Sequence, residues 1–180
     1  MNAITPFDHW RRARDRLTRE QFVAQNAYPF LISGSTQAGK IASPNGPGPV
    51  DFYTQIQGPA SKLHARPIAK RTTPVHVLPM RRAVGSLSAD RLSVGRAPGC
   101  DLVIVDPSVS KIHGHFTSVT SASAVFTDAN SANGTRIDAM MVPRGGTMEL
   151  KKFHYIVFGR VRLLMVSAAE AYDWLGGALF

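Results

Sequence analysis

The chain has 180 residues and a formal net charge of +9, and 44% of its residues are hydrophobic, which is enough for one well-packed domain. Its single cysteine, Cys100, excludes an intramolecular disulfide. No apolar run approaches the roughly 20 residues that a membrane span needs, and the N-terminus lacks the pattern of a signal peptide, so we expect a cytoplasmic protein with no membrane partner.

Residues 6–25 have the pattern of two short helices. Thr18 and Gln21 have the spacing of a capping box that would begin the second helix. Such a pair is compatible with a DNA-reading helix-turn-helix, but apolar stripes of this kind more often pack on a neighbouring surface. The stripe in the first helix consists of Phe7, Trp10, Ala13 and Leu17. A short strand is expected over residues 28–32.

Residues 33–49 are rich in Gly, Ser and Pro and are typical of a loop or linker. Gly34, Gly39 and Lys40 imitate the spacing of a phosphate-binding P-loop. However, Ile41 stands where a Ser or Thr must ligate magnesium, and the prolines that follow prevent a helix. We therefore expect no nucleotide, no metal and no other cofactor.

From residue 50 onward the sequence favours many short strands, as in a sandwich or barrel, and the fold class is mainly β. A terminal helix is expected over residues 168–175, where Gly176 and Gly177 would stop it. The expected strands cover residues 51–57, 65–69, 75–80, 91–95, 102–105, 114–119, 124–127, 135–137, 140–142, 148–150, 155–158 and 161–166.

The positive charge is concentrated in residues 62–95, where seven basic side chains stand against one acidic side chain, Asp90. Such a segment attracts polyanions, which leaves nucleic acid open as an alternative partner. Aromatic residues do not alternate with these charges, as base stacking would require, so nucleic acid is the less favoured partner. The basic residues are Lys62, Arg66, Lys70, Arg71, Arg81, Arg82 and Arg91.

Three short motifs follow expected strands. They are Gly95-Arg96, Ser110-Lys111-Ile112-His113 and Asn133-Gly134-Thr135. Together they supply a guanidinium, a hydroxyl, an ammonium and an amide, which suit a phosphate monoester and the peptide backbone beside it. The sequence offers no paired carboxylates, no nucleophile beside a base and no metal-ligand cluster, so we expect a binding protein rather than an enzyme.

These motifs, in this order and with these gaps, resemble the forkhead-associated (FHA) domain. The resemblance implies an FHA-like β-sandwich of two twisted antiparallel sheets, with the binding loops at one end. We expect an N-terminal extension with short helices over residues 1–61, the FHA domain over 62–167 and a C-terminal helical tail over 168–180.

The resemblance also implies the role of each side chain in phosphothreonine binding. Arg96 and Ser110 would bind the phosphate, and Lys111 would add a second cation. Asn133 would hold the peptide backbone beside the phosphothreonine. The expected structural supports of the site are Gly95, His113, Gly134 and Thr135.

The sequence departs from the family pattern at two places. Ala132 replaces a residue that is often polar, which removes one possible side-chain contact. Phe153-His154 replaces the usual Gly-Asp before the closing strand, in a turn that we expect to leave binding unchanged.

The leading hypothesis is therefore a phosphothreonine-dependent adaptor whose partner is a Thr-phosphorylated protein, a Ser/Thr protein kinase or the substrate of one. In a second form of this hypothesis, Thr72 or Thr73 is phosphorylated and occupies the phosphate site of the same chain or of another copy. The alternatives are a phosphate-independent FHA scaffold subunit of a larger assembly and a nucleic-acid-binding protein that uses residues 62–95.

Overall fold

The computed structural model describes residues 6–33, 75–84, 86, 88 and 90–177. Several predictions from the sequence lie outside the described residues: the strands at 51–57 and 65–69, the P-loop-like segment at 34–41, and Thr72 and Thr73. Within the described ranges, no helix has the length and apolar character that crossing a membrane requires.

Two short helices begin the described chain, α1 (Pro6–Asp15) and α2 (Arg19–Gln25). The predicted capping box at the start of α2 is confirmed: the Gln21 amide N–H donates to Thr18 Oγ1 at 3.3 Å, and the Thr18 amide donates to Gln21 Oε1 at 3.0 Å. The predicted terminal helix is also present as α3 (Ala168–Leu175). Ser167 and Glu170 form a second capping box at its start, and Gly176 ends it.

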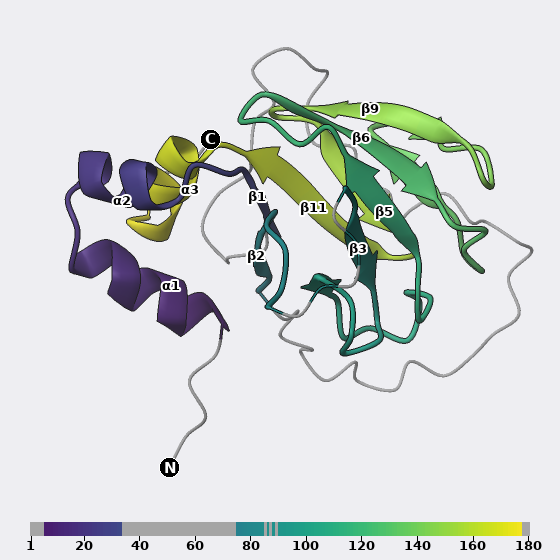
Figure 1. Cartoon of the computed structure of the whole chain (residues 1–180), viewed down its shortest axis with the longest axis horizontal. Helices are drawn as coiled ribbons and strands as arrows, with labels where there is room; N and C mark the ends of the chain where they lie inside the picture. Colours follow the sequence, from purple (N-terminus) through teal and green to yellow (C-terminus); the bar gives the residue numbers. More distant parts are fainter. Residues whose placement is uncertain (1–5, 34–74, 85, 87, 89, 178–180) are drawn as a thin grey trace, which may run out of the picture.

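The strands form two sheets (Figure 1). The first has the order β2-β1-β11-β10-β7-β8, and every neighbouring pair in it is antiparallel. Its strands are β1 (Phe30–Ile32), β2 (Val77–Pro79), β7 (Thr135–Ile137), β8 (Met140–Met141), β10 (Tyr155–Phe158) and β11 (Val161–Val166).

The second sheet has the order β4-β3-β5-β6-β9. Here the expectation of antiparallel sheets needs a correction, because β3 and β4 pair in parallel and the sheet is mixed. The Asp101 carboxylate fixes this arrangement by accepting hydrogen bonds from the backbone and side chain of Ser93. The strands are β3 (Leu92–Gly95), β4 (Leu102–Val103), β5 (Gly114–Thr117), β6 (Ser123–Asp128) and β9 (Thr147–Lys151).

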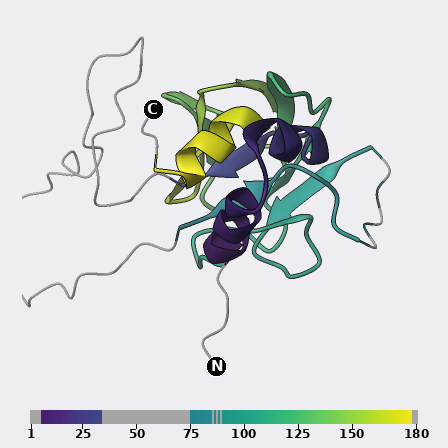
Figure 2. The ribbon, with the colours of Figure 1, turned by 90° about the vertical axis from the view of Figure 1, so that its left-hand side faces the viewer.

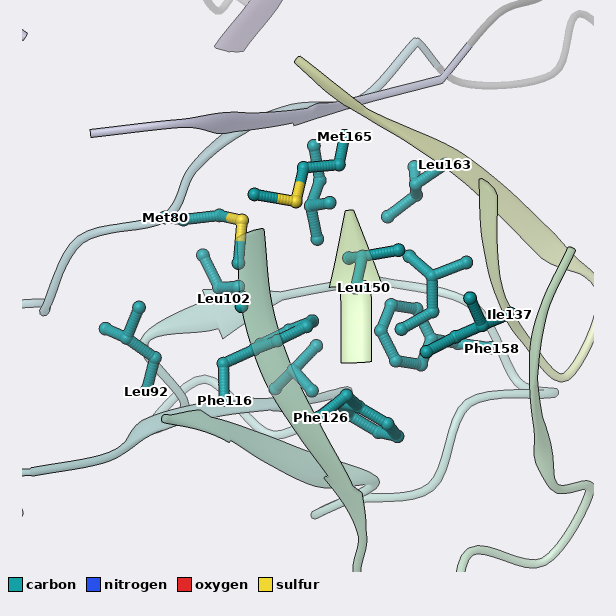
Figure 3. Close-up of a cluster of buried hydrophobic side chains, with 14 of the residues drawn as sticks. Met80, Leu92, Leu102, Phe116, Phe126, Ile137, Leu150, Phe158, Leu163 and Met165 are labelled. Atoms are coloured by element: carbon teal, nitrogen blue, oxygen red, sulfur yellow. The ribbon is translucent and has the colours of Figure 1, made fainter. Parts of the chain in front are cut away.

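The main hydrophobic core lies between the two sheets (Figure 3). Phe116 and Phe126 from the second sheet pack with Phe158 from the first, and all three are fully buried. The mainly β sandwich with helices near both ends of the chain is thereby confirmed.

A second apolar cluster lies on the outer face of the first sheet, under the three helices (Figures 1 and 2). Alternate residues of the same strand enter different clusters: Leu31 of β1 faces the main core, whereas Phe30 and Ile32 face the helices. Trp10 of α1 and Trp174 of α3 complete the outer cluster. The apolar stripe of the first helix therefore packs on a neighbouring surface, as expected from the sequence.

The boundaries of the predicted domains stay a prediction, because most of the stretch that contains the 61/62 division lies outside the described residues. Within the described part, β1 is hydrogen-bonded between β2 and β11 in the first sheet. A segment of the predicted extension is thus a strand of the sandwich.

Candidate functional site

The strand register places the ends of several strands together. Val94 lies opposite Gly114, Gly114 opposite Asp128, and Thr135 opposite Phe158. Because each of these pairs is antiparallel, the loops that follow β3, precede β5 and precede β7 meet at one end of the sandwich, together with the β10–β11 turn. All three sequence motifs lie in these loops, where rigid strands hold recognition residues in place.

Arg96 is exposed and lies directly after β3. Its amide donates to the Ser110 carbonyl at 2.8 Å, and its Nε donates to the Val109 carbonyl at 3.2 Å. Within the described residues the two terminal guanidinium nitrogens have no hydrogen-bond partner. The hydrogen bond from Nε therefore orients the side chain, while the two terminal nitrogens of the guanidinium remain available to a ligand.

Gly95 allows two segments to lie close together. A Cβ at this position would stand only 2.9 Å from the carbonyl carbon of Lys111. The close approach lets the Ala97 amide donate to the Lys111 carbonyl at 3.0 Å. The predicted supporting role of Gly95 therefore has a steric explanation.

Ser110 has its hydroxyl oriented by a neighbouring loop. The Ala132 amide donates to Ser110 Oγ at 3.0 Å, which leaves the hydroxyl proton available for donation. Lys111 beside it is exposed, and its ammonium has no partner within the described part of the chain. The departure from the family pattern at Ala132 thus leaves intact a backbone contact to Ser110.

His113 is fully buried and joins two of the loops. Its Nδ1 accepts the Ser110 amide at 3.1 Å, so the proton of the neutral ring lies on Nε2, which donates to the Gly134 carbonyl at 3.3 Å. The ring also packs edge-on against Phe158, with centroids 5.3 Å apart. Burial lowers the pKa of His113 below its ordinary value, although the Gly134 carbonyl and Asp128 oppose this effect.

Asn133 is exposed at the other side of the loop cluster. Its Nδ2 donates to the Ser108 carbonyl at 2.8 Å, which fixes the amide and directs Oδ1 away from this bond. Gly134 follows with φ +73°, in the left-handed region that glycine adopts without strain. The structure brings all the predicted site residues into the same end of the sandwich.

Asp128 was not singled out from the sequence, yet it anchors the loop that carries Asn133. This fully buried carboxylate accepts hydrogen bonds from the Ser131 amide at 2.8 Å, the Ser131 hydroxyl at 2.7 Å and the Thr135 hydroxyl at 2.7 Å. Burial alone would raise the pKa of Asp128, but the hydrogen bonds from Thr135 and Ser131 hold it below its ordinary value. The acidic residue between a strand and a Ser-containing turn was the signal for this role.

Asp106 and Arg160 form a second support that the sequence did not indicate. The guanidinium contacts both carboxylate oxygens, with Nε 3.0 Å from each and Nη2 2.9 Å from Oδ2. Asp106 Oδ1 also accepts the Ser108 amide and hydroxyl, and the Arg160 amide donates to Ser108 Oγ at 3.1 Å. This network ties the β10–β11 turn to the residue whose carbonyl holds Asn133.

Among the described residues, no group of three or more His, Cys, Asp or Glu side chains is arranged to hold a metal ion. The chemistry available at the loop cluster is that of cations and hydrogen-bond donors on a rigid frame.

A comparison with protein-family models identifies the domain that carries these loops. Residues 92–159 match the family model of the FHA domain, and this segment runs from β3 to the β10–β11 turn. Residues 92–159 are an FHA domain. The resemblance found in the sequence motifs is thereby confirmed.

One curated relative of the FHA domain is the FHA domain-containing protein PS1 of Arabidopsis thaliana. It is 33% identical over 87 residues, which make up 46% of this chain and 6% of that protein. The match therefore spans only a small part of the relative's length, and it concerns the FHA domain rather than the whole relative.

Solved structures of FHA proteins are also similar. The FHA domain of CT664 from Chlamydia trachomatis is 17% identical with a TM-score of 0.42, covering 77% of this chain and 97% of that one. Mycobacterium tuberculosis EmbR, solved in complex with a low-affinity phosphopeptide, is 20% identical with a TM-score of 0.41, covering 51% of this chain and 22% of that one. The assignment of the FHA domain therefore rests on the match of residues 92–159 to the family model and not on these structures.

Proposed function

We propose that the FHA domain of this protein binds a phosphothreonine-containing segment of a protein partner. The observation that carries the proposal is the pairing of the Arg96 guanidinium, whose terminal nitrogens have no partner among the described residues, with the oriented Ser110 hydroxyl. His113 fixes the Ser110 loop, and the bond from the Arg96 amide to the Ser110 carbonyl ties Arg96 to that loop.

The phosphate is bound by charge and by directed donors. Phosphothreonine carries a charge of about −1.5 to −2 at pH 7. One charge pair at about 4 Å and an effective dielectric near 20 contributes roughly 4 kcal/mol before desolvation and solvent screening reduce it. Ser110 adds a charge-assisted hydrogen bond of about 1.5–3 kcal/mol, and Lys111 adds a second cation.

The peptide backbone is bound by Asn133. One N–H of its Nδ2 donates to the Ser108 carbonyl, which leaves Oδ1 to accept a backbone N–H of the peptide and the second N–H to donate to a backbone carbonyl. Gly134 and Thr135 support this residue, the first through its backbone conformation and the second through Asp128. The peptide therefore lies between the Arg96 and Asn133 loops.

In this proposal the protein is a non-enzymatic adaptor of Ser/Thr kinase signalling in the cytoplasm. Its partner is a Thr-phosphorylated protein, either a kinase or the substrate of one. The proposed division is an FHA domain over residues 62–167, an N-terminal extension over 1–61 and a tail over 168–180, with β1 of the extension completing the first sheet of the domain.

The test is calorimetric titration with a degenerate phosphothreonine peptide pool and with its phosphoserine and unphosphorylated counterparts. We expect binding that requires phosphothreonine and falls by about 100-fold or more in Arg96→Ala. Arg11→Ala is the matched control, because it removes an exposed arginine from α1 and should leave affinity unchanged.

Two results contradict the proposal. Failure of the folded native protein to bind any pool favours the phosphate-independent scaffold. Salt-sensitive binding to nucleic acid that is unaffected by Arg96→Ala favours the basic segment at residues 62–95 as the functional surface.

A further inference from the structure

A hollow of about 320 Å³ lies at the end of β3 and β5 opposite to the FHA loops. Leu92 at the start of β3 pairs with Phe116 near the end of β5, whereas Gly95 and Gly114 lie at the other ends of these strands, beside the loops. In Figure 3, Met80 and Leu92 lie at one side of the core, and Phe158, which contacts His113, lies at the other. The hollow is therefore separate from the proposed phosphothreonine site.

The rim of the hollow carries an excess of positive charge. Arg81, Arg82 and Arg91 line it, against one acidic side chain, Asp90. All four side chains belong to exposed residues, and none of the three arginines has a carboxylate partner within the described ranges. Arg81 also lies over the ring of Tyr28, with Cζ 5.5 Å from the ring centroid.

Some basic side chains elsewhere in the described chain have acidic partners, such as Arg19 with Asp173 and Arg160 with Asp106, whereas others, such as Arg11, have none. Around the hollow the charges remain uncompensated. In agreement with this, the charge of Arg91 adds to burial in lowering the pKa of His115 on the neighbouring strand.

The floor of the hollow is apolar and the wall carries hydroxyl groups. Met80, Leu92 and Phe116 form the floor and are buried, while Thr117 and Ser118 lie on the wall. An apolar floor lowers the local dielectric, which strengthens the attraction between the arginines and an anion above it. Arginine is the side chain best suited to bidentate contacts with phosphate, and hydroxyl groups add donors.

The size and composition of the hollow favour a compact ligand. Its volume is at the lower end of the range for small-molecule sites, which fits a single side chain better than a polymer. Asp90 on the rim would repel a continuous track of phosphates. No aromatic side chain is exposed in the lining for base stacking, because Phe116 is fully buried.

From these observations we infer that the hollow is a second anion site, which takes a phosphorylated side chain of a protein partner through Arg82, Arg91 and Arg81. It functions independently of Arg96. A partner that carries two phosphate groups would then contact both ends of β3 and β5.

The test uses the Arg96→Ala protein, so that the FHA loops do not contribute to phosphate binding. The probe is capped phosphothreonine, and the readout is the amide resonances of Leu92, Thr117 and Ser118 in NMR spectra of the isotope-labelled protein. We expect saturable shifts at these amides, and no response to capped threonine or capped glutamate.

A second pair of variants assigns the binding to the hollow. In the Arg96→Ala background, Arg82→Gln with Arg91→Gln should weaken the response about tenfold. Arg11→Gln with Arg12→Gln removes the same charge from the exposed face of α1 and should have no effect. The replaced residues are exposed, so thermal melts of the two double variants should agree within a few degrees.

Four results overturn the inference. Three concern the probe: shifts that do not saturate, an equal response to capped glutamate, and an equal response of the two double variants. The fourth is that single-stranded DNA or phosphoinositide vesicles bind through the same arginines far more tightly than the probe. Because every protein in this test carries Arg96→Ala, these outcomes do not bear on the proposed phosphothreonine function of the loops around Arg96. Failure of that function would likewise leave this site untouched.

Discussion

Gly95 shows how one missing side chain sets the distance between β3 and the loop that carries Ser110 and Lys111. Replacing it with alanine places a Cβ against the Lys111 carbonyl, so the two segments must separate. We expect Gly95→Ala to lower the free energy of unfolding by about 1–3 kcal/mol, as overpacking does, and to weaken phosphopeptide binding. Chemical denaturation and calorimetry measure the two effects.

Gly99 provides the control for this prediction. It lies in the loop that follows β3, and an added Cβ would have no atom within 4 Å. Gly99→Ala should therefore change stability by no more than about 0.5 kcal/mol. Equal stability of the two variants would show that the close approach at Gly95 is unimportant.

We expect His113 to make the stability of the loops depend on pH. A proton on Nδ1 would remove the acceptor for the Ser110 amide. Because the pKa of His113 is lowered by burial, its contribution to stability is fully present above its unfolded pKa of about 6.5 and is lost as the pH falls through the folded pKa. We expect the free energy of unfolding to decrease on acidification with a slope of at most about 1.4 kcal/mol per pH unit from this residue.

The measurement is denaturation of the unliganded protein at several pH values between 7.5 and 5, so that titration of a phosphate ligand does not interfere. Burial also lowers the pKa of His76 and His115, so these residues contribute to the acid response in the same direction. His113→Asn should reduce stability at neutral pH and make the acid response shallower. An unchanged pH profile in this variant would contradict the assignment.

We expect Arg160 to affect peptide binding through other residues. It holds Asp106 and Ser108, and the Ser108 carbonyl holds Asn133. We expect Arg160→Ala to weaken phosphopeptide binding by about threefold to tenfold while capped phosphothreonine binds the FHA loops as before, because only the backbone contact is loosened. Arg162→Ala removes the next exposed arginine, which stacks on Tyr155, and serves as the control.

At the residue scale, the motifs predicted the side chains proposed to contact a ligand and the supports within the motifs, such as His113, but not the support from Asp106 and Arg160. Arg96, Ser110 and Asn133 follow from their positions after strands. Asp106 and Arg160 are 54 positions apart in the sequence, and their contact depends on how two loops meet in space. No local pattern carries that information.

Helix α3 shows the effect of a single capping residue. The Ser167 hydroxyl accepts the Glu170 amide, and the Glu170 carboxylate accepts the Ser167 amide at 2.8 Å and also pairs with Lys152. We expect Ser167→Ala to reduce the free energy of unfolding by about 1 kcal/mol, with Ser167→Thr nearly neutral. Thermal or chemical denaturation tests this, and phosphopeptide affinity should be the same in both variants.

At the element scale, most strand positions could be predicted because alternation and turn residues are local signals. The helix capping at Thr18 was found in the same way. The parallel pairing of β3 and β4 was not predicted, because contacts that accompany it, such as the hydrogen bond from the Ser93 amide to Asp101, have no local sequence signal. Pairing direction depends on such contacts rather than on strand propensity.

The whole molecule has two apolar clusters that share the first sheet. Both faces of β1 and β11 are buried, so Phe30, Leu31 and Ile32 are all inaccessible to solvent. The sequence showed a short apolar run here, but the run by itself did not reveal that helices cover the outer face. The N-terminal segment is consequently part of the folded unit that carries the FHA loops.

This arrangement predicts that a chain beginning at residue 62 does not fold stably. It lacks β1, which separates β2 from β11, and it exposes the outer cluster, in which each large buried side chain contributes about 1.5–3 kcal/mol. We expect loss of cooperative thermal unfolding, measured by circular dichroism. Adding residues 1–61 as a separate peptide should restore it, whereas unchanged melting of the shortened chain would contradict the prediction.

The pairing of β1 with β11 has a consequence for biosynthesis. Phe30 lies opposite Val166, so 136 positions separate the partners along the chain (166 minus 30). At synthesis rates of roughly 5–20 residues per second, β1 waits about 7–27 s after leaving the ribosome tunnel before its partner follows. During that interval the backbone groups of β1 that later pair with β11 are available to chaperones, and a slowly translated message would lengthen that exposure.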